Sequence, residues 1–374
     1  MKRQIVATAA ALALLVPVFV FTASSKMPDF EVYWRAGARA LAAEPLYRAE
    51  DEHYQLKYLP AFAVLAIPLS LVPLSVAKGA WFLASAALIA LLLTQSLTIL
   101  PARHRPSWVL IIVTLLAMAK FYGHELVLGQ VNLLFATLIV TTVRCMTGGR
   151  PFTAGLLVAL AIVIKPYGVI FVPWLAAMRA GAALAAALAG TAAAALLPVA
   201  IYGLERTLTL HLEWWRTVTE STAPNLLNAD NASLAGMYAK WLGPDAAAVW
   251  FTLVSSIALL AAAAIVFLQR RHVEKPAGLE SALLLMLIPL LSPQGWDYVF
   301  LVSTPAVMYV VNYDRQLPPM MRTLTWAALA VAAFSLYDVM GRQAYAVFMA
   351  WSVITVCYLM VVFTLGTLRA RRVA

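Results

Sequence analysis

The sequence predicts an all-α polytopic membrane protein, and three observations lead to that prediction. Of its 374 residues, 63% are hydrophobic and only 12% are charged. Soluble domains carry about 25% charged residues, so this chain has too few to cover a water-soluble particle. Its mean hydropathy is +0.84, and the basic residues form short clusters between apolar runs. The net charge of +10 is therefore explained by membrane topology rather than by binding of nucleic acid.

Twelve apolar runs are candidate membrane spans, because a crossing needs about 20 apolar residues and fewer where helices break. The run 59–74 carries three prolines and is interpreted as a half-depth or interfacial segment instead. A cleaved signal peptide is the alternative for the first run, but its length and the many later runs favour an uncleaved helix. The spans form one integral membrane domain over 1–374 and lie near 5–22, 77–100, 107–122, 130–143, 152–164, 167–178, 181–202, 246–268, 278–291, 297–312, 322–337 and 343–366.

The distribution of charge predicts the orientation of these spans. With the N-terminus in the cytoplasm, every cytoplasmic connection carries Lys or Arg, as the positive-inside rule expects. Only Glu274, Glu280 and Asp314 of the 17 acidic residues then fall on the cytoplasmic side. We therefore expect a multi-pass protein of the inner (plasma) membrane with both termini in the cytoplasm. Two long segments, 23–58 and 203–245, then face the extracytoplasmic side as ordered structure rather than linkers.

The first of these segments holds the leading catalytic candidate, Asp29. The stretch 29–43, "DFEVYWRAGARALAA", predicts an amphipathic helix on the outer membrane surface, with Phe30, Tyr33, Trp34, Gly37 and Leu41 on its apolar face. Asp29 at its start is also a residue type that often caps helices, so a purely structural role is the alternative. Its exposed position predicts a near-normal pKa. Glu31 points to the solvated face.

Four further polar motifs interrupt or end apolar runs at the same side. Polar residues and broken helices at membrane depth are tolerated only where they line a cavity or are buried in protein. Lys165 in "VIKPYG" is the strongest of these candidates, and an ion pair with an outer acid such as Glu125 is its structural alternative. The motifs are "GHELVLGQVN" with Gln130 and Asn132, "VIKPYG", "NADNASLAGM" with Asn231, and "LLSPQGWDYVF" with Ser292, Gln294, Trp296 and Asp297.

Cofactor chemistry has little support in the sequence. The five histidines are scattered, with no pair at metal-ligand spacing, and Cys145 and Cys357 lie at or in expected spans. No Gly-rich phosphate loop or dinucleotide fingerprint is present. We therefore predict neither a metal nor a cofactor. If a phosphate group is bound, the site lies outside the cytoplasmic membrane face, where nucleotide sugars are not available. A lipid-linked phosphate is then the natural donor.

Taken together, these motifs resemble the opening and core of glycosyltransferase family 87. The resemblance rests on "DFEVYWRAGARALAAEPLY", "KYLPAFAVLAIPLSLVP", "GQVN", "KPYG", "NASL" and "SPQGWDY", which occur in the family's order over about 30–300. The family consists of polyprenyl-phosphate-sugar-dependent, mostly mannosyl, transferases of the GT-C membrane class. It implies a GT-C-type helical bundle of the cell envelope, with a lipid-linked sugar as donor and a glycolipid or glycan as acceptor. The oligomeric state stays open.

The resemblance also implies roles for particular residues. A catalytic carboxylate in the first outer loop matches Asp29, which would act as general base in an inverting transfer. Lys165 suits the departing phosphate, with Gln130 and Asn132 as hydrogen-bond partners and Arg206 and Arg216 as weaker candidates. Other cavity candidates are Glu31, Tyr33, Tyr58, Asn231, Ser292, Gln294, Trp296 and Asp297.

Two positions depart from the family pattern, and two other function classes remain open. "KYLP" replaces a more usual Tyr-Pro-Pro, and Asp297 stands where the family carries a histidine that helps to hold the lipid phosphate. An ionised aspartate cannot hold a phosphate. Either Lys165 and the arginines suffice for this role, or the protein uses a different donor or arrangement. The alternatives are a transporter or lipid flippase built on the broken helices near 164–168 and 289–298, and an assembly partner in which Asp29 is only a cap.

Overall fold

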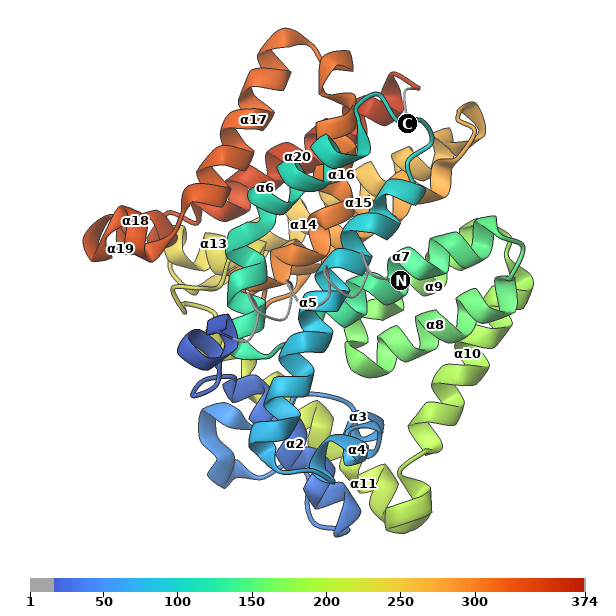
Figure 1. The fold of residues 1–374 in the computed structure, drawn as a ribbon, viewed down its shortest axis with the longest axis vertical. Helices are drawn as coiled ribbons and strands as arrows, with labels where there is room; N and C mark the ends of the chain where they lie inside the picture. The colour runs from blue at the N-terminus through green and yellow to red at the C-terminus, as the bar shows by residue number, and fades with distance from the viewer. Residues whose placement is uncertain (1–16, 373–374) are drawn as a thin grey trace, which may run out of the picture.

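The structure, a computed structural model, describes residues 17–372 as a bundle of helices (Figure 1). Within that range every regular element is helical, and the only bridge between extended residues joins Asn231 to Trp296. This confirms the all-helical class that the sequence predicts. The first expected span, 5–22, and with it the question of a cleaved signal peptide, lies largely outside the described residues.

Among residues 17–372, four helices are long and apolar enough to cross a membrane. They are α5 (Leu74–Thr98), α6 (Ser107–Leu128), α14 (Ala246–Leu268), which continues into η4 (Gln269–His272), and α20 (Val353–Ala370). The pair α10 (Gly181–Leu196) and α11 (Val199–Glu220) would be a fifth, but the two are bent by 92°. The protein thus has the apolar helices of a membrane protein, and the number twelve stays a prediction.

The remaining bundle helices are shorter. Several of them coincide with expected spans, and their breaks fall where the polar motifs lie, at 165 and 292–296. They are α7 (Asn132–Thr147), α8 (Pro151–Ile164), η3 (Pro166–Ile170), α9 (Phe171–Ala177), α15 (Pro276–Leu291), η5 (Asp297–Ser303), α16 (Thr304–Tyr313), η6 (Asp314–Gln316) and α17 (Pro319–Phe334).

The expected last span, 343–366, is divided in the structure. Helix α19 (Arg342–Ala350) ends before Ser352, which adopts the left-handed conformation with φ of 50°, and α20 begins at the next residue. A non-glycine residue in this conformation ends a helix, so one straight crossing is excluded. Figure 1 shows α19, with the short α18 (Tyr337–Met340), projecting sideways from the bundle.

A layer of short helices covers one end of the bundle, at the bottom of Figure 1. It contains α2 (Pro28–Leu41), η2 (Ala49–Tyr54), α3 (Pro60–Leu65) and α4 (Ile67–Ser70), with α11 beside them. Neither α3 nor α4 is long enough to span a bilayer. The second outer segment continues from α11 through α12 (Thr222–Asn225) and α13 (Leu234–Leu242).

Helix α2 is enclosed by protein rather than lying open on a membrane surface. Phe30, Tyr33 and Gly37 are buried as the expected apolar face requires, but Leu41 is 57% exposed. At Gly37 an ideal Cβ would lie 2.4 Å from the carbonyl oxygen of Ala66, so only glycine lets the α3–α4 junction approach this closely. The expectation that this face lies on the membrane surface is therefore wrong for Tyr33, whose ring is buried inside this layer.

Candidate functional site

The N-terminus of α2 packs against the turn between α6 and α7. Gly129 ends α6 in the left-handed conformation with φ of 73°, and an ideal Cβ there would lie 2.7 Å from Cβ of Phe30. The backbone N–H of Met27 donates to the carbonyl of Val127 at 2.9 Å. The motif "GQVN" therefore needs its glycine to bring Asp29 and Gln130 to the same place.

Asp29 is not the cap of its helix. Met27 holds the N-cap position, with φ of 63°, and Pro28 and Asp29 are the first helical residues. Asp29 takes part in no ion pair among the described residues. The helix dipole favours a carboxylate in the first turn. Because Asp29 has no ion pair among the described residues, its oxygens remain available for a substrate.

Burial sets the ionisation of Asp29. Loss of solvent raises its pKa above the usual range, and the Gln130 amide and the nearby Lys165 and Lys57 partly offset this rise. The expectation of a near-normal pKa is therefore wrong, because the helix end is half-buried instead of exposed at the surface. Burial likewise lowers the pKa of Lys57, and the negative charge of Asp29 opposes that change. A raised pKa makes the carboxylate a better proton acceptor when it is ionised.

A network of three tyrosines surrounds the Gln130 side chain. The hydroxyls of Tyr33 and Tyr58 are 2.7 Å apart, and both donate to the Gln130 Oε1 atom, at 3.1 and 3.3 Å. The Gln130 Nε2 atom donates to the Tyr298 hydroxyl at 3.2 Å. The network joins four of the quoted motifs, which are separated in the sequence. Tyr298 is the member that the sequence analysis did not select, although it directly follows Asp297 in the quoted "SPQGWDY".

Lys165 lies at the C-terminal end of α8, where the helix breaks before Pro166. Its Nζ atom is 6.0 Å from the ring centroids of both Tyr58 and Tyr167. The alternative of an ion pair with Glu125 is not what the structure shows. Glu125 instead accepts from Asn132 Nδ2 at 2.8 Å and from the backbone of Leu133 at 2.9 Å, and Lys165 has no ion pair among residues 17–372. The ammonium therefore remains available for an anion.

Asp297 has a different environment. It is fully buried, and its carboxylate lies 3.2 Å from Lys120 Nζ and 3.3 Å from His124 Nδ1. Lys120 and His124 are four residues apart on α6, so their side chains share one face of the helix. Lys120 was not among the residues selected from the sequence, and this i,i+4 spacing is the signal that could have identified the pair. The Asp297 carboxylate thus already has partners within the protein. The basic side chains beside it, Lys120 and His124, come from α6.

The motifs at 228–236 and 292–297 hold each other in place. Asn231 is buried, and its Nδ2 atom donates to the carbonyl of Pro293 at 2.9 Å. Gln294 donates to Thr222 at 3.0 Å, while Ser292 donates to Tyr167 at 3.0 Å. Asn231 also pairs with Trp296 through the backbone bridge. Of these residues only Ser292 reaches the surroundings of Lys165, through Tyr167; the others fix the loop.

Three sequence-selected residues are held elsewhere. Glu31 forms an ion pair with Lys78 at 2.6 Å, and Arg206 forms one with Glu213 at 2.6 Å. Arg216 is exposed on α11. The structure does not bring these side chains into the cluster of Asp29, Gln130 and Lys165. In the described part of the chain, no three His, Cys, Asp or Glu side chains are arranged to hold a metal ion.

An apolar cleft of about 810 Å³ lies beside α6, and Asp29, Gln130 and Lys165 are not among the residues that line it. Its walls come mainly from α5, α6, α17 and α18, with Val18 and Thr22, and its polar residues include Lys120, His124 and Tyr345. Val127, whose carbonyl binds the backbone of Met27, also lines it. A narrow apolar space with a few polar groups at one end suits a lipid chain attached to a polar head.

Comparisons with known proteins show what this chain is similar to. A "Polyprenol-phosphate-mannose-dependent alpha-(1-2)-phosphatidylinositol mannoside mannosyltransferase" of Mycobacterium tuberculosis is 28% identical over 260 residues, which is 67% of this chain and 58% of the relative. The chain thus covers little more than half of that relative's length. The family model for glycosyltransferase family 87 matches residues 56–293, which include Tyr58, Gln130 and Lys165 but begin after Asp29. Because this match covers more than half of the chain, the protein belongs to glycosyltransferase family 87.

Proposed function

We propose that this membrane enzyme transfers a sugar, with mannose as the first choice, from a polyprenyl-phosphate donor to a glycolipid or glycan acceptor. The reaction takes place at the extracytoplasmic face of the inner (plasma) membrane, with both termini in the cytoplasm, and inverts the anomeric carbon. The observation that carries the proposal is the placement of Asp29. It is a half-buried carboxylate without an ion pair among the described residues, and its surroundings include Lys165, Gln130 and the tyrosine network.

Asp29 acts as the general base. Its carboxylate accepts the proton of an acceptor hydroxyl while that oxygen attacks the anomeric carbon of the donor sugar. A new glycosidic C–O bond forms as the bond to the phosphate oxygen breaks. Attack from the side opposite the phosphate gives inversion, and one carboxylate suffices because a phosphate leaves without protonation.

Lys165 and the tyrosines receive the departing phosphate. The ammonium of Lys165 is a compact charge without an ion pair among the described residues, which suits a dianionic phosphate. Burial raises the pKa of Tyr33 and Tyr58 well above the usual range, so both stay protonated at neutral pH and keep their O–H donors. Both hydroxyls donate to Gln130 Oε1 in the structure, and the phosphate would replace Gln130 as their acceptor. Asp297, which is paired with Lys120, has no role in phosphate binding in this proposal.

The test is sugar transfer by purified protein in proteoliposomes. Radiolabelled polyprenyl-phosphate-mannose and a bacterial glycolipid extract are the substrates, and the label is followed into a second lipid. We expect transfer, with the anomeric configuration of the product opposite to that of the donor by NMR. Transfer from a nucleotide sugar without a lipid intermediate would contradict the proposal. A lipid flippase is the second candidate because helices break at 165 and at 292–296; it would move labelled lipid across the bilayer without forming a new product.

A further inference from the structure

Helix α11 leaves the bundle at a right angle. The apolar α10 and the helix that follows it are bent by 92°, with a second irregularity at Gly203, where φ is 74°. A helix that turns by 92° from a membrane-crossing neighbour runs along the membrane plane. Figure 1 shows α11 at the lower end, beside α3 and α4. The direction of α11 therefore follows from α10, whatever reaction the protein catalyses.

The side chains of α11 fall on three faces. Leu204, Leu208, Leu212 and Trp215 lie on one stripe and are 60–70% exposed. Thr207 and Leu210 are buried against protein. The exposed polar residues share the third face: Glu205, Thr209, Arg216 and Glu220. A helix with one apolar, one polar and one protein-packed face fits the boundary between lipid and water.

The apolar stripe continues an exposed apolar surface of α10. Leu188 and Leu196 of α10 are more than half exposed, and they precede the bend. The exposed apolar side of α10 therefore continues along α11 past the bend. A protein partner would have to cover both helices, whereas a bilayer covers both without any further contact.

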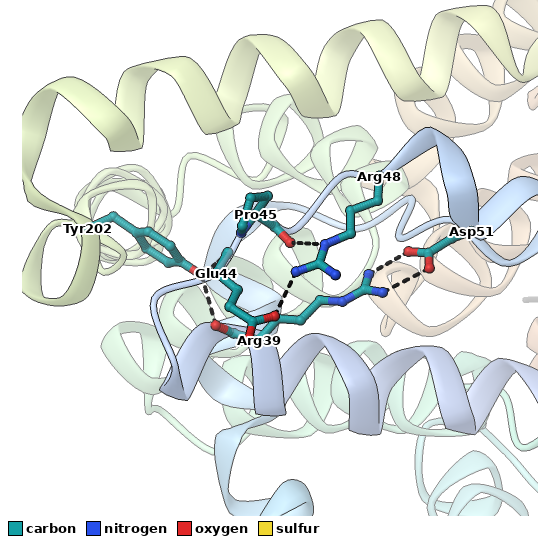
Figure 2. Close-up of polar contacts among 6 residues, drawn as sticks. All are labelled: Arg39, Glu44, Pro45, Arg48, Asp51 and Tyr202. Atoms are coloured by element: carbon teal, nitrogen blue, oxygen red, sulfur yellow. Dashed lines mark hydrogen bonds and ion pairs between the residues drawn. The ribbon is translucent and has the colours of Figure 1, made fainter.

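The protein-packed face of α11 holds the loop that follows α2. The Tyr202 hydroxyl at its start donates to the carbonyls of Glu44 at 2.9 Å and Arg39 at 3.4 Å. The Trp214 indole N–H donates to the carbonyl of Lys57 at 3.2 Å. Figure 2 shows the first of these attachments, together with the Arg39–Asp51 ion pair and the Arg48–Glu44 ion pair inside the loop. The loop is thus tied to α11 at both of its ends.

We propose that α11 lies in the lipid–water interface of one leaflet and holds residues 44–58 at the depth of the lipid headgroups. The stripe of leucines and Trp215 enters the acyl chains, while Tyr202 and Trp214 fix the loop. Lys57 and Tyr58 then stand beside Asp29 at the level where the polar head of a membrane lipid lies. The proposal requires only that α10 crosses the bilayer, so it does not depend on the proposed chemistry.

Site-directed spin labelling in liposomes of phosphatidylethanolamine and phosphatidylglycerol tests the depth. Single cysteines replace Leu208 and Leu212 on the stripe, and Thr209 and Arg216 on the polar face, in a background with Cys145→Ser and Cys357→Ala. We expect the ratio of collision with oxygen to collision with a water-soluble nickel chelate to be several-fold higher at 208 and 212 than at 209 and 216. Equal ratios, or a higher ratio on the polar face, would overturn the interfacial placement even if sugar transfer were normal.

Two adjacent tryptophans provide the matched pair that tests the tether. Trp214→Phe removes the N–H donor to the Lys57 carbonyl, whereas Trp215→Phe alters an exposed ring that lies against Trp214 and leaves that donor in place. Hydrogen exchange of the liposome-embedded protein should become several-fold faster over residues 50–58 in Trp214→Phe and stay unchanged in Trp215→Phe. If Trp214→Phe does not fold, Trp214→His, which keeps an N–H donor, takes its place and should retain slow exchange. The same exchange rate in wild type and Trp214→Phe would overturn the tether.

Discussion

Asp29 and Asp297 differ in whether the protein itself supplies ion-pair partners for their carboxylates. Asp297 is completely buried, and Lys120 and His124 lie within 3.2 and 3.3 Å of its carboxylate. Asp29 is only half-buried and has no ion pair among residues 17–372. Tyr298, the neighbour of Asp297, reaches the same Gln130 as the tyrosines beside Asp29. Burial alone therefore does not identify the proposed catalytic carboxylate, because Asp29, without an ion pair, is the one that can still bind a substrate.

Glu280, toward the opposite end of the bundle, resembles Asp297. It is fully buried and lies 3.3 Å from Arg270 and 3.5 Å from Arg369, and it accepts a hydrogen bond from Trp174 at 3.0 Å. Removing one partner of such a buried group leaves an uncompensated charge and is costly. We interpret both paired carboxylates as supports of the fold.

The largest expected effect is on activity at Asp29. Asp29→Asn should lower sugar transfer by about 10²–10⁴-fold, because the amide cannot accept the hydroxyl proton. Since burial raises the pKa of Asp29, the ionised form costs stability in the folded protein, and the amide should leave the unfolding temperature unchanged or raise it. Transfer assays and thermal unfolding in detergent measure the two effects. The control is Glu31→Gln, whose carboxylate binds Lys78, and more than a tenth of wild-type transfer in Asp29→Asn would argue against the base.

Asp297 should show the reverse pattern. Asp297→Ala leaves Lys120 buried without its partner and should destabilise the fold by about 3–5 kcal/mol, as broken buried pairs do. Thermal unfolding measures the loss. The double variant Asp297→Ala with Lys120→Met should recover most of it, since both charges are then gone. An unchanged unfolding temperature in the single variant would erase the contrast between the two aspartates.

Lys165 should affect transfer less than Asp29 does. Lys165→Met removes one charged group beside the proposed phosphate and should lower transfer by about 10²–10³-fold, the size seen for single donors to a developing anion. Steady-state kinetics with varied lipid donor make the measurement. Arg216→Met is the matched control, because Arg216 is exposed on α11, and it should stay close to wild type. Equal losses in both variants would place the phosphate elsewhere.

The smallest expected effect is a shift in pH dependence. A general base must be ionised, so transfer should fall as the pH drops through the pKa of Asp29, which burial places above the ordinary aspartate range. Gln130 lowers that pKa, and Gln130→Leu should therefore move the acid limb of kcat/KM to higher pH. A shift of up to about 1 pH unit is expected from losing one hydrogen bond to a charged group. An acid limb that stays in place would remove Gln130 from the base's environment.

The sequence predicted the helical class and most of the helix positions, because long apolar runs allow few other structures in a bilayer. It failed where one residue's backbone conformation decides, as at Ser352, which divides the expected last span. It also assigned Tyr33 to a membrane surface, because a helical face that packs on protein and one that packs on lipid have the same periodicity.

The amino-acid sequence by itself determined that this is a helical membrane protein of glycosyltransferase family 87, with polar residues concentrated at the breaks between apolar runs. It also supplied Asp29, Gln130 and Lys165 as candidates. Only the tertiary structure decided that Asp29 is unpaired while Asp297 is paired with Lys120, since these contacts join segments more than 150 residues apart. The physical reason is that a charged side chain can bind a substrate only if no other residue in space already pairs with it. Spacing along the sequence predicts such pairs only between residues within a few helical turns of each other.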